Sequence, residues 1–100
     1  MGQLAFLRTF LLVAFPIDAN ENRRHIHVFF RGGHGRHMQS LAKIWIESGG
    51  EMNVEIAYSS LSEKENRELI DAIEKNWEFI NNQITKTFNG QKTTLKNLED

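Results

Sequence analysis

Four histidines, whose side chains suit acid–base chemistry and metal binding near neutral pH, all lie between residues 25 and 37. His25 and His27 are two apart in a segment that reads as a strand, so both imidazoles face the same way, about 6–7 Å apart. That spacing lets both ligate one metal ion, and His34 and His37 on the following loop could complete an all-histidine site for zinc, nickel or copper. The competing interpretation is structural: the ring nitrogens of His25 and His27 bond to nearby backbone or glutamate.

Basic and aromatic residues are interleaved with these histidines. The candidate binding residues are Arg24, His25, His27, Phe29, Arg31, His34, Arg36, His37, Lys43 and Trp45. Cations that neutralise phosphates and flat rings that accept stacked bases are what single-stranded nucleic acid requires. Histidines beside them make general acid–base cleavage of RNA a further alternative, although no catalytic residue is assigned. The opposing interpretation is that Phe29 and Trp45 are buried, by the loop or by a second copy of the chain.

Length and composition bound the classes of protein to consider. The chain has 100 residues, a formal net charge of −1 and no cysteine. We expect one domain over residues 1–90 and a polar tail over 91–100. The absence of cysteine excludes disulfide frameworks and thiol catalysis. The charge is polarised, because residues 1–46 carry six basic and two acidic side chains, and residues 47–100 carry six basic and eleven acidic ones.

The apolar pattern predicts four strands. We expect them over 4–17, 25–31, 41–47 and 52–59, with a glycine-rich loop over 32–40. The first has apolar residues at both parities, which is typical of a central strand covered on both faces. A three-residue loop at 49–51 keeps one face apolar, because it sets Ile44 opposite Ile56.

The period changes after Leu61. Ser62 and Glu65 form a capping box, and apolar residues three or four apart then continue to Phe88, before Gly90. This pattern predicts one helix of about 26 residues. The expected fold class is α+β: a four-stranded antiparallel sheet followed by one long C-terminal helix packed on one face. The other face is left open and carries the candidate binding residues.

The apolar run over 10–17 is the only segment that resembles a targeting or membrane signal. It is too short to span a membrane, and it lacks the basic start and the cleavage site of a signal peptide. We therefore expect a cytoplasmic protein that contacts no membrane, and we assign it no cofactor.

Two motifs together resemble a known family. His25-x-His27-Val28 and Ala42-Lys43-x-Trp45 on adjacent strands, with Phe88-Asn89-Gly90 closing a helix, are similar to the bacterial domain-of-unknown-function family 4160. The resemblance covers about residues 4–90. It implies a small stand-alone bacterial protein, encoded beside another small domain in an arrangement similar to toxin–antitoxin pairs. It implies no activity.

Together these observations favour a non-enzymatic interaction module that binds a protein partner, or a second copy of itself, through the open sheet face. A protein that binds or cleaves nucleic acid is the main alternative, and a histidine-rich binder of a divalent metal is the third. In the first case a protein or a homodimer is the partner, and in the second nucleic acid is.

Overall fold

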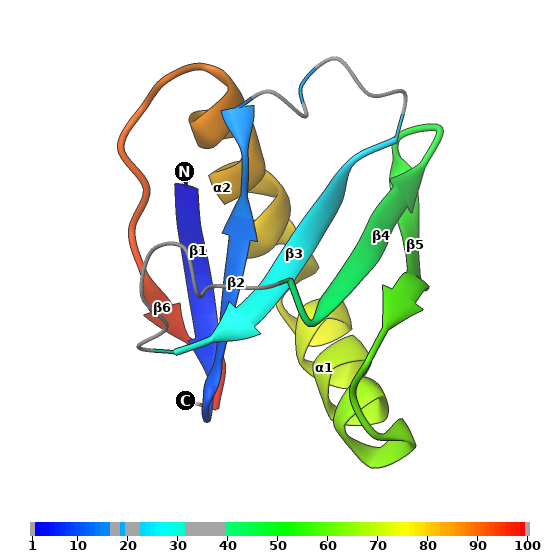
Figure 1. The fold of residues 1–100 in the computed structure, drawn as a ribbon. Helices are drawn as coiled ribbons and strands as arrows, with labels where there is room; N and C mark the ends of the chain where they lie inside the picture. Colours follow the sequence, from blue (N-terminus) through cyan, green and yellow to red (C-terminus); the bar gives the residue numbers. More distant parts are fainter. Residues whose placement is uncertain (1, 17–18, 20–22, 32–39, 100) are drawn as a thin grey trace.

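The fold is a six-stranded mixed sheet with two helices on one face. The computed structural model describes residues 2–16, 19, 23–31 and 40–99. The elements are β1 (Gly2–Leu7), β2 (Phe10–Ala14), β3 (His25–Phe30), β4 (Ala42–Ser48), β5 (Glu51–Ser59), α1 (Glu63–Lys75), α2 (Trp77–Phe88) and β6 (Lys96–Asn97). The strand order is β5-β4-β3-β2-β1-β6, as Figure 1 shows, and only the pairing of β6 with β1 is parallel. The predicted four-stranded antiparallel sheet with one long helix is therefore wrong.

The first predicted strand is in fact a hairpin. β1 and β2 pair with each other and are joined at Arg8 and Thr9, where Arg8 has a left-handed φ of 53°. All five residues of β2 are buried, because alternate side chains pack into the main core on one face and into a second apolar cluster on the other. The prediction failed because both strands are apolar and the turn between them contains no Gly, Asn or Asp.

The β4–β5 hairpin has a two-residue turn instead of the predicted three-residue loop. Ser48 pairs with Glu51, and Gly49 and Gly50 between them have φ values of +60° and +86°. Positive φ at both positions is the conformation that glycine favours in tight hairpins. A register shift in the ladder still brings Ile44 opposite its predicted partner Ile56, so a bulge keeps the apolar residues on one face.

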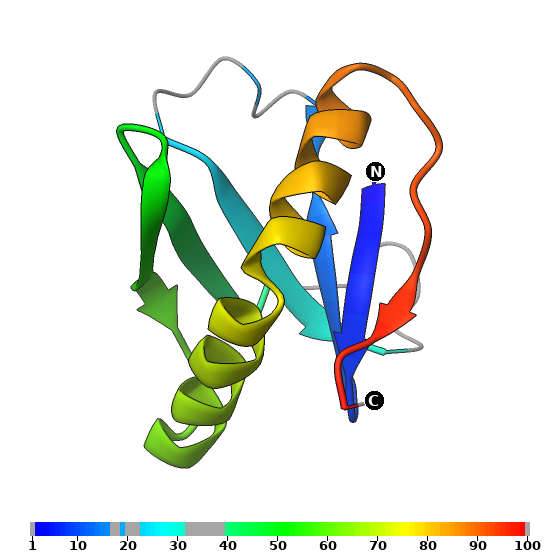
Figure 2. The same cartoon turned by 180° about the vertical axis from the view of Figure 1, so that it is seen from behind.

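The predicted single helix breaks at Asn76. The capping box at Ser62 and Glu65 is confirmed, with both of its hydrogen bonds present. At Asn76 the side-chain Nδ2 donates to the carbonyl of Ala72 at 2.8 Å, competing with the regular helical pattern. The break lets α1 pack on β5 and α2 on β1, across the twisted sheet, as Figure 2 shows. Neither described helix is long and apolar enough to cross a membrane.

The expected polar tail contributes to the fold. Residues 96 and 97 add strand β6 to the sheet, and Leu98 lies in the core with 7% of its surface exposed. The main core lies between the sheet and the helices. Its largest fully buried aliphatic residues are Leu4, Leu12, Ile26, Ile44, Ile46, Leu69, Ile73, Ile80 and Ile84.

Candidate functional site

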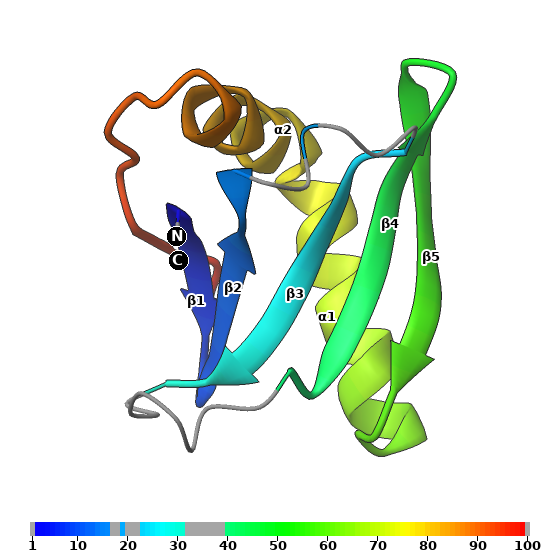
Figure 3. The same cartoon turned by 45° about the horizontal axis from the view of Figure 1, so that its top comes forward.

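The sheet face opposite the helices, called the open face below, is seen in Figure 3. It holds the predicted binding residues His25, His27, Phe29, Lys43 and Trp45. Pairing across the strands sets His25 opposite Trp45 and His27 opposite Lys43. Directly paired residues share a face, so these four side chains lie together as the alternation predicted. Phe29 joins them from the same strand, paired with Leu11 of β2.

Five rings form a continuous row across the open face. Each ring meets the next edge-on: Phe29 with Phe15 at 6.1 Å, Phe15 with His27 at 5.2 Å, His27 with His25 at 5.1 Å, and His25 with Trp45 at 5.3 Å. Edge-to-face contacts suit aromatic quadrupoles, so the rings stabilise one another within the chain. The row joins strands β3 and β4 to the end of β2.

Two cations lie over the ring at the Trp45 end of this row. The guanidinium of Arg23 is 5.1 Å from the Trp45 ring centre, and the ammonium of Lys43 is 4.5 Å from it. Arg23 also donates to the carbonyl of Glu47 at 2.8 Å and to the carboxylate of Glu55 at 3.1 Å. The positive charge here is therefore held in place and partly compensated.

A short hydrogen-bonded chain continues from the row to the edge strand. The Tyr58 hydroxyl donates to the Ser40 hydroxyl at 2.9 Å, and Ser40 Oγ lies 3.3 Å from Nδ1 of His27. Tyr58 is 48% exposed and pairs with Lys43, so it lies on the open face. Nδ1 of His25 lies 3.3 Å from the Arg23 carbonyl, and only 1% of His25 is exposed. Both histidines are thus engaged by neighbours: His25 by a backbone carbonyl, as the structural interpretation expects, and His27 by the hydroxyl of Ser40.

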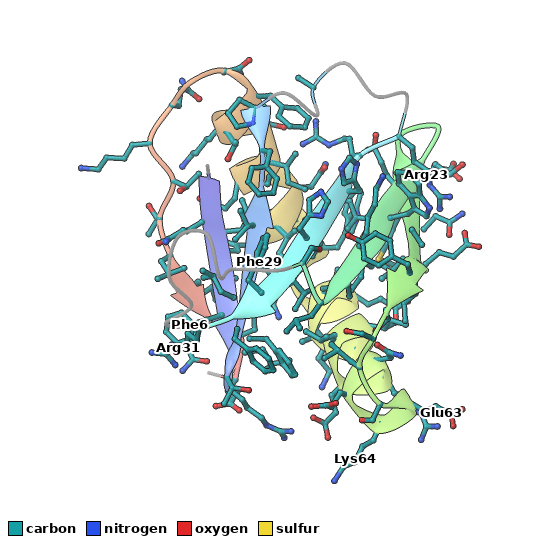
Figure 4. The ribbon with its side chains drawn as sticks, in the orientation of Figure 1. Phe6, Arg23, Phe29, Arg31, Glu63 and Lys64 are labelled. Carbon is teal, nitrogen blue, oxygen red and sulfur yellow. The ribbon has the colours of Figure 1, made fainter. Side chains whose placement is uncertain are left out.

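The other end of the open face is apolar and covered. Leu11, Val13 and Phe29 are buried, with Phe6 and Phe15 packed against them. Figure 4 shows Arg31 beside Phe6, and its guanidinium lies 3.9 Å from the Phe6 ring centre. Arg31 is exposed, so it is the predicted candidate that borders this apolar end.

Arg24, predicted to lie with the open-face residues, is on the helix side. Its Nη2 donates to the carbonyl of Asn81 at 2.7 Å and to the hydroxyl of Thr85 at 2.8 Å, both on α2. Burial lowers the pKa of Arg24, and the nearby carboxylate of Glu47 partly opposes that shift. The alternation itself explains the placement, because residue 24 has the parity of buried Ile26.

Three predicted site residues, His34, Arg36 and His37, lie outside the described residues, so the structure does not test the four-histidine metal site. Within the described part of the chain, no group of three or more His, Cys, Asp or Glu side chains could hold a metal ion. The histidine-rich metal site stays a prediction.

Three contributors to the open face are missing from the predicted set: Arg23, Phe15 and Tyr58. Arg23 precedes the strand by two residues and has the same parity as His25, which places it on the open face. Phe15 follows β2 with the parity of Val13, which becomes visible once the first apolar segment is divided. Tyr58 has the sequence parity of Ile56, but the register shift between them moves it to the other face.

Comparison of the chain with protein-family models, with curated proteins and with solved structures gives no match. The resemblance to family 4160 therefore stays a prediction, and the functional argument depends on the open face alone.

Proposed function

We propose that this chain is an interaction module that binds a protein partner through the Trp45 end of the open face. The surface in question, called the Trp45 cluster, comprises Arg23, Lys43, Trp45, Glu55 and Tyr58. The observation that carries the proposal is that a half-exposed tyrosine and a half-buried tryptophan lie on the same sheet face, where no described helix lies. Trp, Tyr and Arg are the residue types enriched where protein interfaces bind most strongly.

The polar groups of the cluster support a protein ligand. Arg23 and Glu55 present opposite charges, and the Tyr58 hydroxyl adds a hydrogen-bonding group at the rim. Such a mixture of apolar centre and paired charge is typical of the core and rim of a protein interface. The edge of β5 is a less suitable binding surface for a partner. Its exposed Glu51 and Glu55 and its two register shifts oppose the addition of another strand.

Nucleic acid remains the second candidate, supported by Arg23, Arg31 and Lys43 on one face. Two features weigh against it. Base stacking needs an exposed ring face, but cations lie over Trp45 and only 6% of Phe29 is exposed. Arg23 already donates to Glu47 and Glu55, which reduces its capacity for phosphate.

The family resemblance adds a proposal about the partner: the product of a neighbouring gene, in an arrangement similar to toxin–antitoxin pairs, in a bacterial cytoplasm. This part of the proposal depends on the two motifs and not on the geometry of the cluster.

The test is capture of partners by the tagged full chain in the organism that encodes it. Wild type is compared with Tyr58→Ala and Trp45→Ala, and with Phe30→Ala as the matched control. Phe30 is also an exposed aromatic residue, at 54%, but it stacks on Phe10 away from the open face. Tyr58→Ala is included because Trp45 supports buried His25, so Trp45→Ala also disturbs packing.

A captured protein is then purified and titrated against each variant. The proposal expects affinity to fall at least about tenfold in Tyr58→Ala and Trp45→Ala, and to be retained in Phe30→Ala. Equal loss in all three variants, or none in the two open-face variants, would contradict it. A parallel titration with mixed-sequence RNA at low salt and at about 0.3 M distinguishes the alternative, because phosphate binding weakens steeply with salt.

A further inference from the structure

The outer edge of β1 is occupied by the far end of the chain, as Figure 1 shows. Residues 91–99, called the C-terminal strap below, pair with β1 only through Lys96 and Asn97. We propose that this edge is a strand-binding site that can exchange its own strap for the same strap of a second copy. The product is a strand-swapped dimer, and the inference is independent of the function proposed above.

The strap contains the features by which the β1 edge recognises a strand. The Thr93 hydroxyl donates to the carbonyl of Gln3 at 2.8 Å, and the Leu98 N–H donates to the carbonyl of Phe6 at 2.8 Å. Leu98 then enters the core between the sheet and the helices. Backbone pairing with one apolar anchor is the usual means by which a sheet edge binds an added strand.

Charged side chains in and after β6 also make specific contacts. Arg8 Nε donates to the carboxylate of Glu99 at 3.0 Å. The ammonium of Lys96 lies 5.0 Å from the ring centre of Phe79 and 3.3 Å from Oδ1 of Asn76. These contacts define the occupant by chemistry: an extended segment with a leucine anchor, a lysine before it and an acidic residue after it. A second copy of this chain supplies that segment.

The first part of the strap, between α2 and β6, permits exchange. Residues 91–95 have no regular structure, and Gly90, where α2 has ended, has a left-handed φ of +71°. Leu95 is 44% exposed, so this segment is held by the hydrogen bonds of Thr93 and Thr94 and has no apolar anchor of its own. A strap from another chain makes the same contacts as the chain's own strap, and exchange therefore costs mainly the entropy of association.

The opposite sheet edge provides the contrast. No strand among the described residues lies beyond β5, which is nine residues long and has two register shifts. Its exposed glutamates discourage pairing. The β1 edge, by comparison, already holds a strand, and that strand is only two residues long.

The experiment uses introduced cysteines, because the chain has none of its own. A full chain with Gln3→Cys is mixed with a full chain carrying Thr93→Cys, and disulfide-linked heterodimer is measured over time and concentration. The control mixture pairs Thr9→Cys, in the turn at the other end of β1, with Thr93→Cys. A single chain with both Gln3→Cys and Thr93→Cys shows whether the strap lies on β1 in the monomer.

We expect heterodimer above the control level, increasing with concentration. Adding Leu98→Ala to both chains should accelerate its formation about tenfold or more, because the anchor that holds each strap is lost. Leu95→Ala, on the same strap but exposed, should change the rate by less than about twofold.

Three results would overturn the inference. They are heterodimer no higher than in the control mixture even with Leu98→Ala, a rate that does not respond to Leu98→Ala, and failure of the double variant to form its disulfide within one chain.

Discussion

The two faces of the sheet use their apolar residues differently: the helix side carries the main core, and the open face carries a smaller apolar cluster and a row of rings. On the helix side, aliphatic residues such as Ile44 and Ile73 are wholly buried between two layers. On the open face, rings contact one another edge-on across β3 and β4, two cations lie over Trp45, and Tyr58 at the end of the network is half exposed. This difference indicates that the helix side supplies most of the stability, whereas the open face holds polar and aromatic side chains in fixed positions.

The largest change in the free energy of unfolding is expected for a substitution on the helix side. Trp77 donates its indole N–H to the carbonyl of Ile46 at 2.8 Å and packs on the core. We expect Trp77→Ala to lower the free energy of unfolding by about 3–5 kcal/mol. Urea titration followed by circular dichroism measures it, with Phe30→Ala as a control that should cost about 1 kcal/mol or less. A loss for Trp77→Ala no larger than the control would break the account of the helix side.

Two adjacent arginines test the boundary between the faces. Arg24 donates to two acceptors on α2 and has 22% of its side chain exposed, so Arg24→Met should lower the free energy of unfolding by about 1–3 kcal/mol. Arg23 lies over Trp45 instead, and Arg23→Met should cost about 1 kcal/mol. Thermal unfolding of the two variants compares them directly. If the order is reversed, the assignment of the two arginines to different faces is wrong.

The smallest effect concerns the start of α1 and depends on pH. The backbone N–H of Ser62 and then the Ser62 hydroxyl lower the pKa of Glu65 below its usual 4.5. A lowered pKa in the folded state means that the contribution of Glu65 to stability is present above pH 4.5, and is lost as the pH falls through the folded value. The stability of Glu65→Gln should therefore depend less on pH across that acidic window than that of wild type.

Glu63→Gln is the matched control for this measurement, since Glu63 lies in the same helical turn but outside the capping box. Unfolding of the three proteins by urea, from neutral pH down to the acid limit of folding, provides the comparison. A pH profile of Glu65→Gln that follows wild type would show that the capping box contributes nothing through its charge.

Alternation and periodicity predicted what depends on local pattern. The positions of β3, β4 and β5, the capping box, and the shared face of His25, His27 and Trp45 all follow from spacing alone. Arg24 was placed with them wrongly, although its parity already matched the helix side. The binding role of these residues is not tested by the fold and stays a prediction.

The features that were missed depend on contacts that are distant in sequence or on a single backbone conformation. The apolar segment of β1 and β2 divides at Arg8, whose positive φ no propensity indicates. The apolar period runs through Asn76 without interruption, although the helix breaks there as it crosses the twisted sheet. Strand β6 was missed because the strap is mostly polar in sequence. A strand of two residues can be held by a single buried apolar residue, here Leu98.

The most direct test of the central claim is an amide NMR spectrum of the labelled full chain with and without its captured protein partner. If the open face is the binding surface, the largest shifts will fall on β3–β5, around Trp45 and Tyr58, and the amides of α1 and α2 will change little. Shifts concentrated on the two helices, with β3–β5 unchanged, would contradict the claim and assign binding to the opposite side of the molecule.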